Sequence, residues 1–130
     1  SPFANRSHIS ELLQKLRSIK SAMSAQTVTE IPHNYHHLNN RRFVSSKMEW
    51  VHPKERARAY NKELKEEQFF SFGNAVAVRV QALLNQETLW ARPSQGVVIQ
   101  RGFALDIDTK DDLFLGNALI HYANKTAKGE

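Results

Sequence analysis

The sequence predicts an α/β protein built around a mostly parallel sheet, and three observations lead to this class. Residues 7–20 carry apolar side chains at the helical period, residues 22–31 are rich in β-branched side chains, and residues 75–80 form a continuous apolar run. Helical and strand patterns therefore alternate along the chain. Such alternation is typical of a sheet that is covered by helices.

The first two elements are an amphipathic helix and a strand. The helix spans 7–20 with Ser7 as its expected N-cap, and its apolar face is formed by Ile9, Leu12, Leu13, Leu16 and Ile19. The strand spans 22–31 and ends before Pro32, whose ring nitrogen cannot donate a hydrogen bond. Together they supply the first helix and the first strand of the predicted domain.

The middle of the chain differs from both flanks. Residues 33–53 are polar and turn-rich, and two short apolar stretches around Ser45-Ser46-Lys47 indicate a hairpin. Residues 54–68 carry charges of both signs and predict an exposed helix or loop. We therefore expect an excursion from the sheet over 33–53, within a single domain of residues 1–130.

The second half of the chain returns to apolar elements. Residues 75–80 predict a strand covered on both faces, residues 81–84 a helical turn, and residues 97–99 and 104–107 two further strands. A capping box then opens a helix, in which the expected buried face follows the cap. The box is formed by Thr109 and Asp112, and the face by Leu115, Ala118, Leu119 and Tyr122.

The composition excludes several classes of protein. The 130 residues contain no cysteine, which excludes disulfide scaffolds, thiolate zinc sites and cysteine catalysis. No apolar run approaches the ~20 residues of a membrane span, so we expect no membrane partner and a cytoplasmic location. The balance of 18 Lys and Arg against 13 Asp and Glu gives a net charge of +5. This charge suits an anionic partner, although a basic surface also serves solubility.

Two aspartates form the sharpest candidate site. Asp106 and Asp108 stand two residues apart at the expected strand-to-helix junction, and an extended backbone places both carboxylates on one side. Ligands of open α/β sheets collect at the carboxyl ends of strands, and paired oxygen ligands suit Mg²⁺. The alternative is that Asp106 makes a surface contact and Asp108 helps to cap the helix.

Two further clusters are weaker candidates. His33, His36 and His37 resemble zinc ligands only loosely and are better explained as a solvated loop, while His8, His52 and His121 are expected to be isolated. A basic set interleaved with aromatic residues suggests phosphate contacts and stacking on nucleic acid. Nearby glutamates dilute this set, so a solvated face is preferred and no nucleic-acid partner is expected. The set comprises Arg41, Arg42, Lys47, Lys54, Arg56 and Arg58, with Tyr35, Phe43, Trp50 and Tyr60 among them.

The aspartate segment resembles the closing motif of a known enzyme family. Asp106-Ile107-Asp108-Thr109-Lys110-Asp111-Asp112-Leu113 is similar to the motif of the acylneuraminate cytidylyltransferases, which activate sialic acid and related acidic sugars. The resemblance covers nearly all of the chain and implies the C-terminal portion of a Rossmann-like nucleotide-diphospho-sugar transferase fold, with a mixed sheet flanked by helices. Weaker similarities follow the family's order at Ser1-Pro2-Phe3, Ser24–Glu30, Glu49–Pro53 and Gly73–Val78.

The resemblance implies a reaction and a set of residues. These enzymes transfer CMP from CTP to the anomeric hydroxyl of an acidic sugar, with Mg²⁺, and release pyrophosphate. By the resemblance, Asp106 and Asp108 hold the Mg²⁺. The residues that it places near the substrate are Lys62, Gly73 and Asn74. Residues 33–53 correspond to a protruding arm that exchanges between subunits, so a homodimer or higher oligomer is expected.

One element of the family is not found in the sequence. The chain contains no loop rich in Gly, Arg and Lys that would bind the triphosphate, so we expect it to be inactive alone. Two alternative hypotheses stand beside the enzyme. A non-catalytic dimerising module derived from the same fold is motivated by Gly73 and Ala77 at positions near the sugar. A nucleic-acid-binding domain is motivated by the basic stretch at 41–60.

Overall fold

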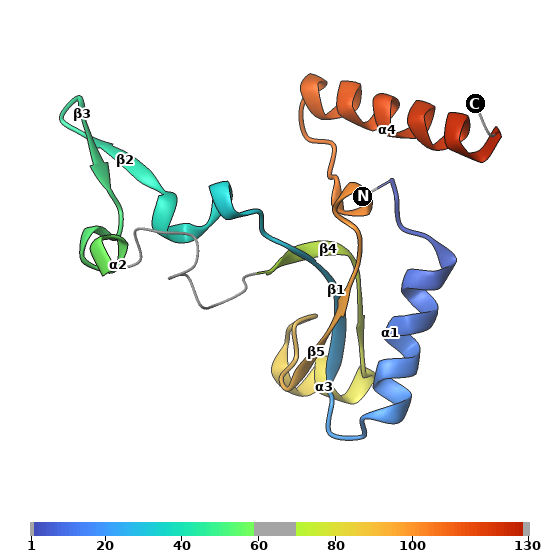
Figure 1. The fold of residues 1–130 in the computed structure, drawn as a ribbon. Helices are drawn as coiled ribbons and strands as arrows, with labels where there is room; N and C mark the ends of the chain where they lie inside the picture. The colour runs from blue at the N-terminus through green and yellow to red at the C-terminus, as the bar shows by residue number, and fades with distance from the viewer. Residues whose placement is uncertain (1, 59–69, 129–130) are drawn as a thin grey trace. The chain divides into compact units, whose positions relative to one another are not determined.

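The computed structural model describes residues 2–58 and 70–128, and its elements belong to two units (Figure 1). The first unit combines residues 1–29 with 72–130, and the second comprises residues 30–71. The first unit contains α1 (Arg6–Ser18), β1 (Ser24–Glu30), β4 (Phe70–Val78), α3 (Val80–Gln86), β5 (Ser94–Val98), the 3-10 helix η4 (Arg101–Ala104) and α4 (Lys110–Lys128). The second contains η1 (His33–Tyr35), η2 (His37–Asn39), β2 (Arg41–Val44), β3 (Lys47–Trp50) and α2 (Pro53–Arg58).

The sheet of the first unit has three strands in the order β4-β1-β5. β1 and β5 run parallel, with Thr27 opposite Val97 and Val28 opposite Val98. The α/β class predicted from the sequence is confirmed at this level, as a small domain whose sheet packs against helices. The sheet is mixed rather than mostly parallel, because β4 joins the other edge of β1 in the opposite direction.

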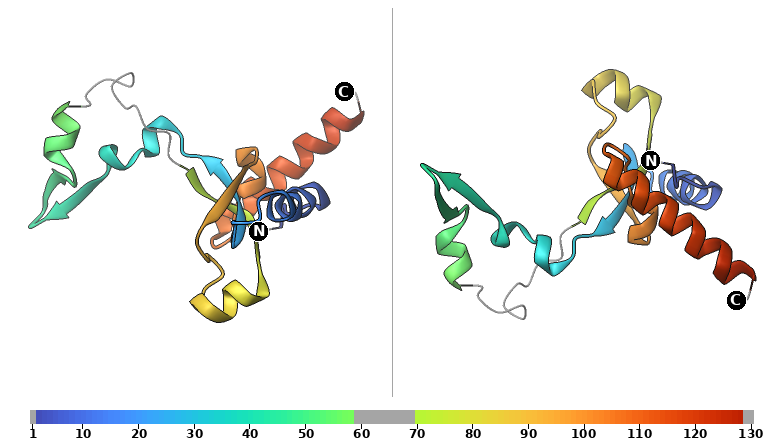
Figure 2. Two further views of the ribbon diagram at one scale, coloured as in Figure 1. Left: turned by 90° about the horizontal axis from the view of Figure 1, so that it is seen from below. Right: turned by 90° about the horizontal axis from the view of Figure 1, so that it is seen from above.

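The helix α1 lies along one face of this sheet, as Figures 1 and 2 show. The predicted helix at 7–20 is confirmed, but Asn5 rather than Ser7 is its N-cap. The Asn5 side chain accepts the His8 N–H at 3.1 Å, because the helix begins at Arg6 and places Ser7 inside the first turn. The core of the unit is formed by Leu12, Leu16, Ala22, Ala25, Val97 and Ile99.

Arg79 ties the end of α1 to the sheet. Its guanidinium donates to the carbonyl oxygens of Leu16 and Ala22, and its backbone N–H donates to the carbonyl of Met23 at 2.9 Å. The carbonyls of the last helical turn have no partner within a helix, and a cation is favoured at that end by the helix dipole. Arg79 therefore satisfies the C-terminal end of α1 from the neighbouring strand connection.

The later elements differ from the prediction at their ends. β4 begins at Phe70, and Val80 opens α3 instead of closing the strand expected at 75–80. The helical turn expected at 81–84 is confirmed within α3. The strand expected at 97–99 is confirmed as β5, which begins at Ser94 and ends at Val98.

The strand expected at 104–107 is wrong. η4 ends at Ala104, and residues 105–108 form no helix or strand. The Ile99 N–H donates to the carbonyl of Val28 at 2.8 Å, and β1 ends two residues later, so the sheet offers no neighbouring strand to residues 104–107. The chain turns into η4 instead.

The helix α4 begins at the predicted capping box but exposes most of its apolar side chains. The expected buried face is wrong, because Leu115, Leu119 and Tyr122 are 51%, 38% and 68% exposed. Only Gly116 is buried among the residues of α4 whose side chains are described, where it faces Ile107. No helix within residues 2–58 or 70–128 has both the length and the hydropathy that are needed to cross a membrane.

The second unit contains the hairpin predicted within residues 33–53. β2 and β3 pair antiparallel, with Arg41 opposite Trp50 and Phe43 opposite Met48. The two residues between the strands, Ser45 and Ser46, have φ values of 48° and 65°. Positive φ at both central positions matches a type I′ turn, whose twist suits a two-residue hairpin. The structure thus confirms a hairpin in this segment.

Gly73 marks a close approach of β4 to β1. A Cβ atom at this position would lie 2.7 Å from Thr27 Oγ1, 3.0 Å from the Thr27 carbonyl carbon and 2.9 Å from Ile99 Cδ1. Thr27 is fully buried, and its hydroxyl oxygen accepts the N–H groups of Asn74 at 2.8 Å and Ala75 at 2.9 Å. Glycine is therefore required here by space.

Gly73→Ala is expected to lower the free energy of unfolding by about 1–3 kcal/mol, because the added methyl group overpacks the contact with Thr27. Gly96→Ala is the control, since its Cβ would lie at an ordinary 3.5 Å from Val28, and it should change the free energy by less than about 0.5 kcal/mol. Urea denaturation followed by circular dichroism measures both. Equal stability of the two variants would contradict a tight contact at Gly73.

Candidate functional site

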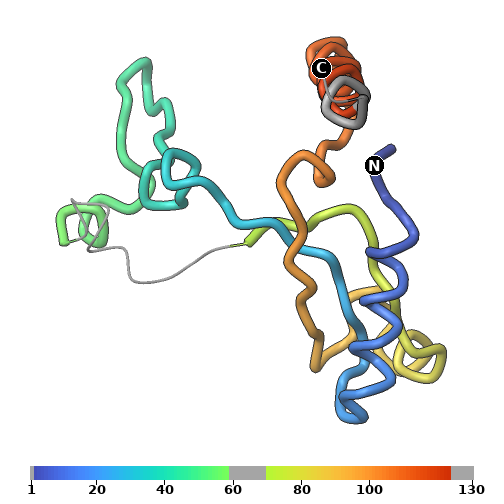
Figure 3. The backbone as a smooth tube through the Cα atoms, turned by 45° about the vertical axis from the view of Figure 1, so that its right-hand side comes forward, coloured from blue at the N-terminus to red at the C-terminus, as the bar shows by residue number. Residues whose placement is uncertain are grey.

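Asp106 and Asp108 lie in the segment 105–108, between η4 and α4. Figure 3 follows the backbone from β5 through this segment into α4. Ligands of open sheets collect beyond the carboxyl ends of parallel strands. β5 is parallel to β1 and ends at Val98, and η4 lies between that end and this segment, so the aspartates do not stand directly at a strand-to-helix junction as expected. Both aspartates are exposed to solvent. Leu105, which precedes them, has an extended backbone with φ −63° and ψ 124°.

The capping box at the start of α4 is formed by Thr109 and Asp112, as predicted. Asp112 Oδ2 accepts the Thr109 N–H at 2.8 Å and the Thr109 hydroxyl at 2.6 Å, and Thr109 Oγ1 accepts the Asp112 N–H at 3.2 Å. Asp108 takes part only through its backbone N–H, which donates to Asp112 Oδ2 at 3.3 Å. Asp108 thus helps to cap the helix through its backbone N–H rather than through its carboxylate.

The two carboxylates fit a magnesium ion by the chemistry of their donor atoms. Mg²⁺ is commonly held by one or two carboxylates while it keeps several waters and contacts phosphate oxygens. Within the two described stretches of the chain, no three His, Asp or Glu side chains gather into a metal site. Asp106 and Asp108 therefore offer at most two protein ligands.

The three residues expected near a substrate have different positions in the structure. Gly73 is buried against Thr27, and Asn74 is half-buried with its side chain bonded inside the protein. Lys62 lies outside the described residues. Asn74 Nδ2 donates to the carbonyl oxygen of Phe103 at 2.9 Å, three residues before Asp106. One hydrogen bond therefore joins β4 to the element that precedes the aspartates.

His8 is a polar contact that the sequence interpretation missed. It was expected to be isolated, but it is only 5% exposed, and its Nδ1 lies 3.0 Å from Asn74 Nδ2. Its ring meets the ring of Phe103 edge-on at 5.1 Å. The signal was present in the spacing, because His8 stands four and eight residues before Leu12 and Leu16, on the buried side of α1.

The histidines of the second unit are more ordered than a solvated loop. His36 is 7% exposed, its Nδ1 accepts the Leu38 N–H at 3.2 Å, and its ring stacks on His37 at 4.5 Å. His52 is not isolated, since its ring meets His37 edge-on at 5.4 Å. The loop prediction for this cluster is therefore wrong for His36. His121, on α4, is exposed as expected.

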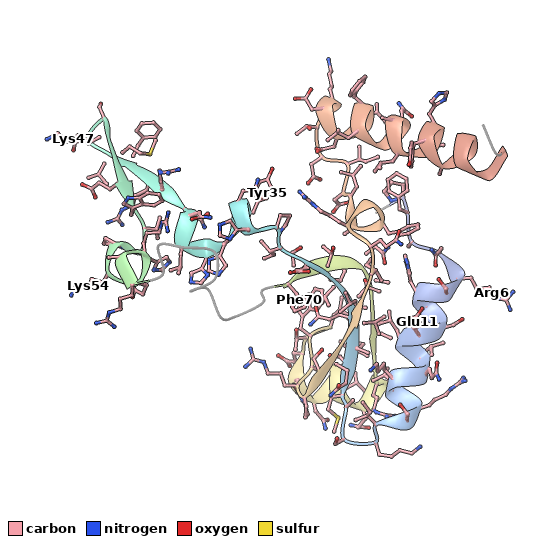
Figure 4. The ribbon with its side chains drawn as sticks, in the orientation of Figure 1. Arg6, Glu11, Tyr35, Lys47, Lys54 and Phe70 are labelled. Atoms are coloured by element: carbon pink, nitrogen blue, oxygen red, sulfur yellow. The ribbon has the colours of Figure 1, made fainter. Side chains whose placement is uncertain are left out.

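The basic and aromatic residues of the second unit contact each other. The guanidinium carbons of Arg41 and Arg56 lie 4.0 Å and 5.0 Å from the centre of the Trp50 ring, as in cation–π contacts. Arg42 and Glu49 form an exposed ion pair at 3.9 Å, which contributes little stability. Figure 4 shows Lys47 at the hairpin tip and Lys54 on α2. Tyr60 lies outside the described residues.

The cap of α4 predicts a specific response to acid. Hydrogen bonds from the Thr109 hydroxyl and backbone N–H lower the pKa of Asp112 below its usual value. A lowered pKa means that this carboxylate stabilises the folded helix above the ordinary aspartate pKa of ~3.9, and that the contribution disappears as the pH falls through the lowered pKa. Wild-type α4 should therefore fray in acid below about pH 4.

Asp112→Asn should remove this part of the acid transition, because asparagine does not titrate. Asp111→Asn is the matched control, since it removes a carboxylate from the same turn but leaves the bonds with Thr109. NMR amide signals of residues 109–115, followed between pH 6 and pH 2.5, measure the transition. Identical titrations in the wild type and Asp112→Asn would refute the assignment.

Comparison with known proteins adds no family to this description. No protein-family model matches the chain, and no curated protein is significantly similar to it. The candidate site therefore rests on the geometry of its own residues and on the aspartate motif.

Proposed function

We propose that this chain is the C-terminal portion of a magnesium-dependent cytidylyltransferase that transfers CMP from CTP to an acidic sugar of the sialic-acid type. The observation that carries the proposal is the position of Asp106 and Asp108. They lie after β5, in the segment between η4 and α4, and directly precede a helix that is capped by Thr109 and Asp112. The resemblance of residues 106–113 to the closing motif of the acylneuraminate enzymes supplies the reaction.

In the proposed reaction, the anomeric hydroxyl of the sugar attacks the α-phosphorus of CTP, and pyrophosphate leaves. Asp106 and Asp108 would hold Mg²⁺, which neutralises charge on the phosphate oxygens when it is bound. The cap of Asp112 on Thr109 fixes the start of α4 directly behind these carboxylates. The Asn74 bond to Phe103 fixes the chain in front of them. The segment is therefore restrained at both ends.

The chain lacks a Gly-, Arg- and Lys-rich loop for the triphosphate, so we propose that it does not turn over CTP alone. Exposed apolar side chains support a homodimer or higher oligomer. On α4, Phe114 is 73% and Tyr122 68% exposed, and on the hairpin Phe43 is 75% exposed. Apolar surface of this kind marks interaction sites. The proposed arm is residues 33–53, and the proposed location is the cytoplasm.

Divalent-cation binding tests the proposed role of the aspartates. The chain should bind Mn²⁺, a paramagnetic substitute for Mg²⁺, and Asp106→Asn or Asp108→Asn should each weaken binding about tenfold, because each removes one of two charged ligands. Asp111→Asn carries the same charge change and should bind like the wild type. Electron paramagnetic resonance of free Mn²⁺ gives the affinities. Equal binding by all four proteins would refute the assignment.

Calorimetry with CTP and Mg²⁺ tests whether the chain is complete. We expect no tight CTP binding by the 130 residues, and tight binding would contradict the proposed need for a further triphosphate loop. A longer protein that includes such a loop should bind CTP.

A non-catalytic dimerising module is the second candidate, and the hairpin favours it. Directly opposed residues of an antiparallel pair share a face, so Phe43 and Met48 form one exposed apolar pair, 75% and 54% accessible. Val44 pairs with Lys47 on the other face. Turnover of CTP and an acidic sugar by the longer protein would exclude this candidate, whereas dimerisation is common to both.

Light scattering at micromolar concentration measures the oligomer. The wild type should be a dimer or larger, and the Phe43→Ser/Met48→Ser double variant should dissociate, because it removes the apolar pair. Val44→Ser, on the opposite hairpin face, is the control and should stay associated. A monomeric wild type would contradict the proposed arm.

A further inference from the structure

We propose that Asn74 and His8 position the aspartate segment through a partly buried hydrogen-bonded bridge, and that Asn74 acts in this way rather than by touching the substrate. The inference rests on the proposed function for the purpose of the segment. The bridge itself is defined by contacts among β4, α1 and η4. It runs from His8 Nδ1 through Asn74 Nδ2 to the Phe103 carbonyl.

The donors of the Asn74 side chain are both used inside the protein. An asparagine amide nitrogen carries two hydrogens, and Asn74 Nδ2 lies 2.9 Å from the Phe103 oxygen and 3.0 Å from His8 Nδ1. Asn74 Oδ1 accepts from the Thr27 hydroxyl at 3.1 Å. A substrate could gain an Asn74 donor only by breaking one of these bonds. Asn74 is therefore suited to holding neighbouring elements in place.

The backbone of Asn74 is held as firmly as its side chain. Its N–H donates to the hydroxyl oxygen of the fully buried Thr27 at 2.8 Å, and the adjacent Gly73 allows β4 to reach that position. The amide group consequently projects from a fixed point on the sheet. A hydrogen bond from a fixed point restrains the position of its acceptor.

His8 completes the bridge as an acceptor. An asparagine amide nitrogen can only donate, so the 3.0 Å contact between Asn74 Nδ2 and His8 Nδ1 is a hydrogen bond only when Nδ1 is the acceptor. The edge of the same ring packs against the Phe103 ring at 5.1 Å. Phe103 is thus held at two points, by its carbonyl on Asn74 and by its ring on His8.

The position of Phe103 matters because it lies two residues before the segment 105–108, whose own backbone forms neither helix nor strand. Hydrogen bonds on both sides of this segment restrain its backbone. One end is the Thr109–Asp112 cap, and the other is η4, whose Phe103 carbonyl belongs to the final turn and needs a partner outside it. Contacts that orient metal ligands from behind typically change metal affinity by about 10–100-fold when they are removed.

Amide hydrogen exchange and Mn²⁺ binding test the bridge. Asn74→Ala should speed exchange in residues 103–108, leave the exchange of β1 and β5 unchanged, and weaken Mn²⁺ binding about tenfold. Asn85→Ala, at an exposed site in α3, is the matched control and should change neither. If Asn74→Ala fails to fold, the His8 pair replaces it: His8→Leu removes the acceptor, and His8→Asn keeps an oxygen near the place of Nδ1.

These measurements distinguish failure of the proposed bridge from failure of the proposed function. Faster exchange in residues 103–108 for Asn74→Ala or His8→Leu, with His8→Asn close to the wild type, supports the bridge. Unchanged exchange in this segment overturns it, as does unchanged Mn²⁺ affinity in Asn74→Ala when the wild type binds the ion. If the wild type binds no Mn²⁺, the proposed cation site fails, and the exchange measurement alone decides the bridge.

Discussion

The contact between Gly73 and the Thr27 hydroxyl is the constraint on which the first unit depends. The Thr27 hydroxyl oxygen on β1 accepts two backbone N–H groups of β4 and so binds β4 to the central strand. The close approach leaves no room for a Cβ atom at Gly73 on β4. Thr27 is fully buried, so an unsatisfied group at this point would carry the full cost of desolvation. Asn74 is the next residue after Gly73. Its side chain contacts His8 on α1 and the Phe103 carbonyl in η4, so the same contact also fixes the point from which these two elements are bound.

The first unit combines a small, tightly packed centre with a largely uncovered helix. The core around Leu12 and Leu16 is completed by alanines and β-branched residues, which allow close packing of α1 on the sheet. α4, in contrast, approaches its neighbours at Gly116, beside Ile107, and at Leu119, beside Gly102, while Phe114 and Tyr122 are largely exposed. Hydrophobic side chains gain stability when they leave water. This exposed surface is the reason that we propose an oligomer.

The sequence predicted those features that arise from neighbouring residues. The helix at 7–20, the hairpin and the Thr109–Asp112 cap each depend on contacts a few residues apart, and all three are present. The strand at 104–107 had a suitable local pattern and failed because a strand also needs a partner, which lies elsewhere in the chain. The strand-to-helix junction expected at Asp106 and Asp108 was wrong for the same reason, since η4 and residues 105–108 separate β5 from α4.

The contacts behind the candidate site were not predictable in the same way. His8 and Asn74 are 66 residues apart in sequence, and Arg79 reaches α1 over a separation of 63 residues. The spacing of apolar and polar residues within one helix or strand gives no information about pairs so far apart in the sequence. The spacing of His8 with Leu12 and Leu16 does indicate that this histidine lies on the buried side of α1. It does not indicate that Asn74 is its partner.

The placement of residues 30–71 has a consequence for how the fold can vary. This unit interrupts the first one between β1 and β4, which are adjacent in the sheet and run in opposite directions. Topologically, the interruption is an oversized hairpin loop on a two-stranded stem. Its length and content can change while the pairing of β1 with β5 and the path into α4 are preserved. The order of the strands in the sheet therefore does not depend on the length of this insertion.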